Sequence, residues 1–215
     1  MLDFLCYQPS DSYLPKQVPP SYIRILHANS GVRKIDVYGN DRLMAKGLSY
    51  RKFTPYFTVP SGQSCIKVLH KGIVAKLDIN LKPGNIRTIA FIQGLPLYDM
   101  ELFEIVDPKV TNNPDMANIR FIHLSSDTAD VDISLSDNII LVEKANYKNI
   151  PNYNPCKAGK YSLKIKPAEA SNTIAALNDI ELKPGWNYTL YIIGLTQGKV
   201  RLQLLLLMDG TTYIK

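Results

Sequence analysis

The stretch Ile23-Arg24-Ile25-Leu26-His27, followed by Ile35-Asp36-Val37, shows how this chain is built. It recurs as Ile119-Arg120-Phe121-Ile122-His123, followed by Val131-Asp132-Ile133, and the separation is 96 residues for both parts. This period is the length of a small domain, whereas solenoid and propeller repeats run to roughly 20–50 residues. The sequence therefore predicts one domain duplicated in tandem.

Length and composition are those of an ordinary globular protein. The chain has 215 residues, of which 46% are hydrophobic, so each half can bury a core. The net charge of +6 is spread along the chain, and no compact cluster of Lys and Arg is interleaved with aromatic residues. We therefore expect no binding to nucleic acid.

Short apolar runs with alternating side chains, separated by turn residues, fill most of the sequence. Lys82-Pro83-Gly84 in the first half and Lys183-Pro184-Gly185 in the second are strong turn signals of this kind. Turns roughly every 8–12 residues are typical of a β-sandwich, and no segment has a helical stripe. The predicted fold is all-β, with two tandem immunoglobulin-like antiparallel β-sandwich domains.

Proline, glycine and asparagine mark the domain boundaries. Residues 1–21 are rich in Pro and Tyr without a strand or helix period, and residues 108–117 hold two prolines and two asparagines. We predict an extended N-terminal arm over 1–21, a first sandwich over 22–107, a linker over 108–117 and a second sandwich over 118–215.

The repeated residues resemble a bacterial family known as the domain of unknown function 4397. Its repeat reads R-x-x-H-A-S-P-D-A-P-x-V-D-V and continues to an L-x-P-G turn before a Y-T strand. The residues that fit this pattern are Arg24, His27, Ala28, Ser30, Asp36 and Val37 in the first copy, and Arg120, His123, Ser125, Asp127, Ala129, Val131 and Asp132 in the second. Both copies lack the two prolines of the family's loop. The resemblance covers nearly everything after residue 21.

The resemblance implies β-sandwich modules, often in tandem and associated with the cell envelope, without established catalytic residues. It therefore supplies no site residue to carry over. The chain has no apolar run long enough to span a bilayer and no secretory signal, so we expect a soluble chain made in the cytoplasm. Placement at a cell or spore surface is suggested by the family resemblance alone.

Two histidines have the chemistry of a catalytic base. His27 lies nine residues before Asp36, and His123 lies nine residues before Asp132, so each carboxylate could orient an imidazole. However, no GxSxG nucleophile motif is present, and the pair recurs in both copies. We therefore predict structural roles for all four residues, no catalytic residue and no enzyme. A hydrolase using His27 or His123 is the weaker hypothesis.

No cofactor or metal site is expected. Asp127, Asp130 and Asp132 could hold a cation, but the first copy places Asn29 and Arg33 in the corresponding loop. Glycines are dispersed rather than gathered in a phosphate-binding loop. The odd number of cysteines, three, fits either reduced thiols or one bridge with a leftover thiol.

The N-terminal arm is the segment that we expect to contact a partner. Its prolines favour an extended backbone, and an extended segment can add a strand to an exposed sheet edge. Cys6, Tyr7 and Tyr13 are the predicted contact residues, and Cys6 could bond to Cys65 or Cys156 of a neighbouring copy.

The sequence thus predicts a non-enzymatic binding or assembly module, with self-association or protein binding through its arm. The alternative is a protein that binds a glycan or small molecule in a cleft between the two domains. A face that includes Tyr50, Tyr56 and Tyr98 could stack on sugars or on another protein, although tyrosines in sandwiches more often pack with the hydroxyl at the rim.

Overall fold

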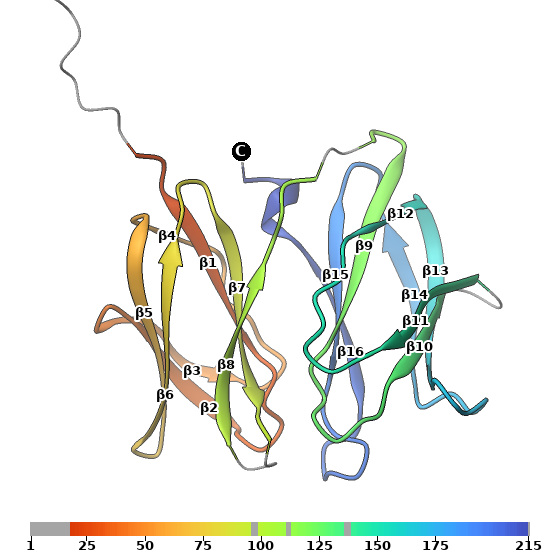
Figure 1. The fold of residues 1–215 in the computed structure, drawn as a ribbon, viewed down its shortest axis with the longest axis horizontal. Coiled ribbons are helices and arrows are strands. Elements are labelled where there is room, and N and C mark those ends of the chain that lie inside the picture. The colour runs from red at the N-terminus through yellow and green to blue at the C-terminus, as the bar shows by residue number, and fades with distance from the viewer. Residues whose placement is uncertain (1–17, 96–98, 111–112, 136–138, 215) are drawn as a thin grey trace, which may run out of the picture.

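The computed structural model describes residues 18–95, 99–110, 113–135 and 139–214. These residues form two β-sandwiches that lie side by side (Figure 1). Each sandwich has two four-stranded sheets, and a single turn of 3-10 helix, η1 (Gly210–Thr212), follows the last strand. The predicted all-β fold with two tandem sandwiches is confirmed.

In each sandwich, one sheet faces the other sandwich and is called here the inner sheet, and the other is the outer sheet. The inner sheet of the first sandwich has the order β4 (Phe57–Val59), β1 (Ser21–His27), β7 (Ile86–Gln93), β8 (Met100–Val106). Its outer sheet has the order β3 (Arg42–Ser49), β2 (Lys34–Gly39), β5 (Gly62–His70), β6 (Ile73–Leu81).

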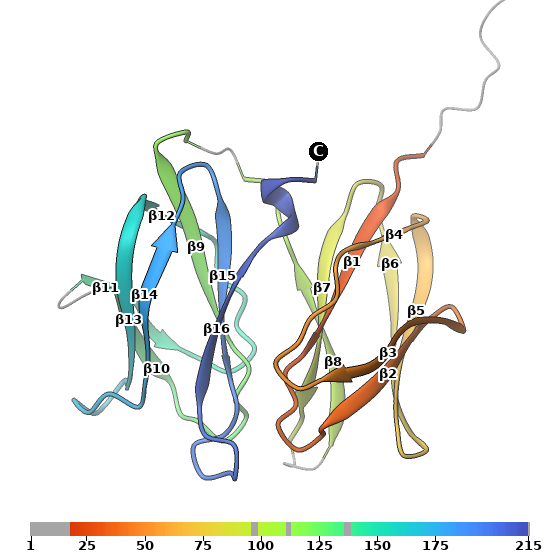
Figure 2. The ribbon, with the colours of Figure 1, turned by 180° about the vertical axis from the view of Figure 1, so that it is seen from behind.

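The second sandwich repeats this arrangement, as Figure 2 shows from behind. Its inner sheet has the order β12 (Asn154–Lys157), β9 (Met116–His123), β15 (Asn187–Ile193), β16 (Gln203–Met208). Its outer sheet has the order β11 (Ile139–Ala145), β10 (Val131–Leu135), β13 (Gly159–Pro167), β14 (Ala175–Leu182). The duplication is therefore complete at the level of strand order.

The strand order differs from that of an immunoglobulin constant domain. There the first, second, fourth and fifth strands share one sheet, whereas here the first, fourth, seventh and eighth do. The sheets are also not wholly antiparallel, because β1 pairs in parallel with β7, and β9 pairs in parallel with β15. Two parallel strands need a long connection between them. Here that connection contains β2 to β6 in the first sandwich and β10 to β14 in the second.

The buried apolar side chains of the described residues form three separate clusters. One core lies inside each sandwich, around Ile35, Val68 and Phe91 in the first and Phe121, Ile165 and Leu190 in the second. The third cluster lies between the two inner sheets, so both faces of these sheets are buried. β1 and β15 accordingly bury nearly every residue rather than every second one.

The strand boundaries refine two predicted domain limits. β1 begins at Ser21, which the sequence placed in the arm, and β9 begins at Met116, inside the predicted linker. Ser21 belongs to the sandwich because its hydroxyl donates to the carbonyl oxygen of Lys82 at 2.9 Å. Residues 1–17 of the predicted arm lie outside the described residues.

Candidate functional site

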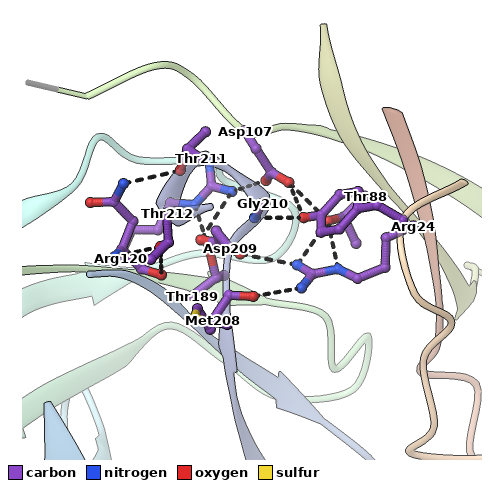
Figure 3. A network of polar contacts seen from close by, with 12 residues as sticks. Arg24, Thr88, Asp107, Arg120, Thr189, Met208, Asp209, Gly210, Thr211 and Thr212 are labelled. Carbon is purple, nitrogen blue, oxygen red and sulfur yellow. Dashed lines mark hydrogen bonds and ion pairs between the residues drawn. The ribbon is translucent and has the colours of Figure 1, made fainter. Parts of the chain in front are cut away.

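A network of buried charged side chains joins the two inner sheets (Figure 3). Arg24, on β1 of the first sandwich, reaches across to the end of β16 in the second. Its Nη1 donates to the carbonyl oxygen of Met208 at 2.8 Å, and its Nη2 lies 3.0 Å from Oδ1 of Asp209. Its Nε and Nη2 also donate to Oγ1 of Thr88 on the neighbouring strand β7.

Arg120 makes the reciprocal set of contacts from the second sandwich to the first. Its Nη1 donates to the carbonyl oxygen of Val106 at 2.7 Å, and its Nη2 pairs with Oδ1 of Asp107. Its Nε donates to Oγ1 of Thr189 at 2.8 Å. Each sandwich therefore gives one arginine and receives one, as at an interface between two copies related by a twofold axis.

Each carboxylate is held by a tyrosine and a threonine of its own sandwich. Oδ2 of Asp107 accepts from the hydroxyl of Tyr56 at 2.7 Å and from that of Thr88 at 3.2 Å. Oδ2 of Asp209 accepts from Tyr153 at 2.6 Å and from Thr189. These hydrogen bonds hold each aspartate in place independently of the arginine from the other sandwich, which favours one geometry for each Arg–Asp ion pair.

The same tyrosines stack on the arginines. The guanidinium carbon of Arg24 lies 4.7 Å from the ring centroid of Tyr56, and that of Arg120 lies 4.6 Å from the ring centroid of Tyr153. A cation over an aromatic face is stabilised further when water is excluded. Each tyrosine therefore contacts an arginine of its own sandwich through its ring and an aspartate through its hydroxyl.

Water has almost no access to these four ions. The exposed fractions are 2% for Arg24, 0% for Arg120, 3% for Asp107 and 0% for Asp209. Burial and the negative charge of Asp209 raise the pKa of Asp107, against the opposing effect of the two arginines. Burial would lower the pKa of Arg24, but the surrounding tyrosines and aspartates outweigh it and raise the pKa. The site thus holds two arginine and two aspartate side chains that are shielded from solvent.

An apolar cluster surrounds the network and fills the space between the inner sheets. Its buried members are Leu26, Ala28, Ala90, Ile92 and Ile105 from the first sandwich, and Ile122, Leu124, Tyr191, Ile193 and Leu207 from the second. At the rim, Nζ of Lys148 pairs with Glu101, and the hydroxyl of Tyr147 donates to the carbonyl oxygen of Gln93 at 2.9 Å. The space in which the sequence predicted a cleft is occupied by this cluster, and the two cavities described below lie on separate domains.

The structure places both candidate histidines inside the protein. His27 is fully buried, neither of its ring nitrogens makes a hydrogen bond, and its ring packs edge-on against Tyr50 and Phe91. His123 is also buried, and its Nδ1 accepts from the backbone N–H of Ser125 at 3.2 Å. Burial lowers the pKa of both histidines, to about 4 for His27. Neutral, enclosed imidazoles are poorly placed to act on a substrate.

The two candidate aspartates do not bond to these histidines. Oδ1 of Asp36 accepts from the backbone N–H of Gly47 at 2.7 Å, and Oδ1 of Asp132 accepts from that of Lys144 at 2.9 Å. Both contacts lie at irregular points in the pairing of a strand hairpin. The aspartates thus satisfy backbone donors where the outer sheets bulge. Among the described residues, no group of three or more His, Cys, Asp or Glu side chains is placed to hold a metal ion.

Acidification is expected to destabilise the protein through His27. Its pKa falls from about 6.5 in the unfolded chain to about 4 in the fold, so the unfolded chain binds the proton more tightly. This contribution to the free energy of unfolding is complete above pH 6.5 and decreases by about 3 kcal/mol as the pH falls to 4.

Urea denaturation at several pH values tests this expectation. The variant His27→Leu should show a flatter decline with falling pH than the wild type. An unchanged slope in the His27 variant would contradict the assignment.

The predicted contact residues of the arm, Cys6, Tyr7 and Tyr13, lie outside the described residues. The two described cysteines are free and differ in access, because Cys156 is buried and Cys65 is half-buried on β5. Tyr98 also lies outside the described residues.

Tyr50 and Tyr56 do not form a sugar-stacking face. The hydroxyl of Tyr50 is buried among the residues between the inner sheets, and Tyr56 belongs to the ion network. Both residues therefore serve the packing between the sandwiches.

The ion network itself was not predicted from the sequence. The sequence identifies Arg24 and Arg120 only as positions of the repeat, and it predicts no role for Asp107 or Asp209. The available signal was an arginine inside an apolar strand and an aspartate after the last strand, each recurring in both copies. Opposite charges that recur in apolar surroundings indicate a buried pair.

Comparison with known proteins identifies one family. The family model described as "Domain of unknown function (DUF4397)" matches residues 21–134 and 126–213, so the matched segments cover both sandwiches. This confirms the resemblance and the tandem repeat that the sequence predicted. No curated protein matches the chain. Among the described residues, no helix is both long and apolar enough to cross a membrane.

Proposed function

Because the chain belongs to the DUF4397 family, whose description assigns no activity, we propose a function from the geometry of the interdomain site. The protein is a non-enzymatic binding and assembly module, in which two sandwiches are locked into one rigid body. The rigid body presents its two outer sheets and its N-terminal arm to partners, of which a second copy of the chain is the first to test.

One observation carries this proposal: the side chains best suited to chemistry are enclosed and bonded to one another. The arginine and aspartate side chains between the inner sheets are at most 3% exposed, and their hydrogen bonds run to each other, to threonine and tyrosine hydroxyls and to backbone carbonyls. Buried ionic networks of this kind can specify one geometry for an interface. Such an arrangement supports a structural role for these side chains.

The mass of the protein in solution, measured by light scattering, tests the assembly role. We expect the full chain to form an oligomer and a chain lacking residues 1–17 to be monomeric. The deletion stops before Ser21, because that residue is part of β1. A truncated chain with the same mass as the full chain would contradict a role of the arm in assembly.

Reductant separates covalent from non-covalent association in the same measurement. If Cys6 forms a bond to a neighbouring copy, Cys65 is the better partner, because Cys156 is buried in the core of the second sandwich. The oligomer of the full chain should then lose part of its mass with reductant, and Cys65→Ser should have the same effect. Association that is insensitive to both would restrict the arm to non-covalent contacts.

Glycan or small-molecule binding is the alternative proposal. Its best-supported location is a cavity on one of the sandwiches rather than the filled space between them. One such cavity, of about 530 Å3, lies beside Asp130, Lys144 and Glu169 on the second sandwich. Placement of the module at a cell or spore surface follows from the family resemblance and is proposed on that basis alone.

A further inference from the structure

The first sandwich is open along one side, where a groove of about 550 Å3 enters between its two sheets. The core residues Ile23 and Ile66, both nearly inaccessible to water, form its floor. Phe57 and Val59 of β4 line one wall, and Leu43 of β3, which is 52% exposed, lines the other. A groove of this size and apolar character can take a few large side chains.

The strands on either side of the groove are the edges of their sheets. Along the part of the chain that the structure describes, the ladder of β3 is formed with β2, and that of β4 with β1. The outer edges of β3 and β4 therefore offer backbone donors and acceptors to an added strand. An extended peptide that lies along the groove could bond to one edge and place alternate side chains on the apolar floor.

The N-terminal arm begins at one end of this groove. Ser61 donates from its hydroxyl to the carbonyl oxygen of Pro19 at 2.8 Å, and the N–H of Gly84 donates to that of Pro20 at 3.0 Å. Pro60, the neighbour of Ser61, lines the groove. These contacts fix the point at which the arm leaves the sandwich (Figure 1).

The direction in which the arm leaves the sandwich favours binding to the groove of another molecule over binding to the groove of the same chain. Val18 and Pro19 each precede a proline, which restricts both to extended conformations, so the chain leaves without an immediate reversal. Seventeen extended residues reach at most about 60 Å, enough to span to a neighbouring copy.

The composition of the arm matches the groove. Leu2 and Phe4 are two residues apart and would share one face of an extended strand, with Asp3 between them. Arg42, exposed at the mouth of the groove, could pair with Asp3, which lies next to Leu2 and Phe4 and far in sequence from Lys16, the one basic side chain of the arm. We propose that the groove between β3 and β4 binds residues 1–17 of a second copy of the chain, as the acceptor site for the assembly role proposed above.

Paired substitutions in the full chain test the site. Leu43→Glu adds a negative charge to the groove and should weaken self-association at least about tenfold, because it removes apolar contact and because the bound arm would bury the new charge. Ile140→Glu is the matched control, since Ile140 pairs with Ser134 as Leu43 pairs with Tyr38 in the first repeat, and it is 55% exposed. Both side chains are exposed, so neither change should unfold the protein.

Light scattering over a range of concentrations gives the association constant of each of the two variants. A weaker association for Leu43→Glu alone supports the groove as the acceptor. Equal effects of the two substitutions, or none, would overturn the acceptor site while leaving arm-dependent assembly intact. A wild-type chain that is monomeric throughout would overturn both proposals.

Isotope-resolved cross-linking distinguishes a second copy from the same chain. A photoreactive benzoylphenylalanine replaces Thr58, an exposed residue that lines the groove, in 14N-labelled protein that is mixed with unmodified 15N-labelled protein. We expect cross-links from position 58 to 15N peptides within residues 1–17. Cross-links to 14N arm peptides alone would place the arm in its own groove, and an absence of arm peptides would exclude the groove. Either result overturns the proposal.

Discussion

Replacement of Arg120 with methionine is expected to lower the free energy of unfolding by about 3–5 kcal/mol, because it leaves Asp107 buried without its partner. The variant also loses the bonds from Arg120 to the carbonyl oxygen of Val106 and the hydroxyl of Thr189. Chemical denaturation measures the loss. The loss of stability should be smaller at low pH, because Asp107 can then be protonated. Burial already raises the pKa of this carboxyl group.

Two further variants test whether the broken Arg120–Asp107 ion pair causes the loss of stability. The double variant Arg120→Met/Asp107→Asn should recover part of the stability, because the neutral amide is less costly to bury than a carboxylate. Lys67→Met breaks the exposed ion pair with Asp41 and should leave the free energy of unfolding almost unchanged. If Arg120→Met is as mild as Lys67→Met, the interdomain network contributes no more than a surface pair.

Replacement of Tyr191 with alanine is the second change with a large expected effect. Its ring is wholly buried between the inner sheets, in the same apolar cluster as the small Ala90, which holds the corresponding position on β7. Truncation should cost about 3–5 kcal/mol through lost contacts and the cavity left behind. Chemical denaturation again gives the value.

The matched control is Tyr191→Phe. The hydroxyl of Tyr191 makes no hydrogen bond, so its removal should leave stability unchanged or slightly increased. A large loss in Tyr191→Phe would show that the hydroxyl has a partner. A small loss in Tyr191→Ala would show that the sandwiches are not tightly packed against each other.

The repeat and most strands could be predicted from the sequence, because local patterns determine them. Turn residues such as Gly39-Asn40-Asp41 and the alternation in Ile73–Leu81 mark strand ends and faces directly. The strand order could not be predicted, since the pairing of β1 with β7 joins segments about 60 residues apart and leaves no local signal. A short edge strand such as β4 likewise depends on the neighbour that it pairs with.

The ion network was missed because its burial depends on a second domain. Ile23-Arg24-Ile25 has the pattern of a strand with one open face, and within a single sandwich Arg24 would indeed face water. The second sandwich covers that face, so the arginine becomes buried and meets Asp209. Similarly, His27 and Asp36 were considered as a pair from their spacing, but they lie in different sheets of the first sandwich.

Differential scanning calorimetry of the wild-type chain tests the central claim, that the two repeats form one locked unit, most directly. A buried apolar cluster and a reciprocal ion network couple the sandwiches, so the structure predicts a single transition, with equal calorimetric and van't Hoff enthalpies at protein concentrations too low for self-association. Arg120→Met should lower the transition temperature and broaden or split the transition. Two separate transitions in the wild type, unaffected by Arg120→Met, would contradict the claim.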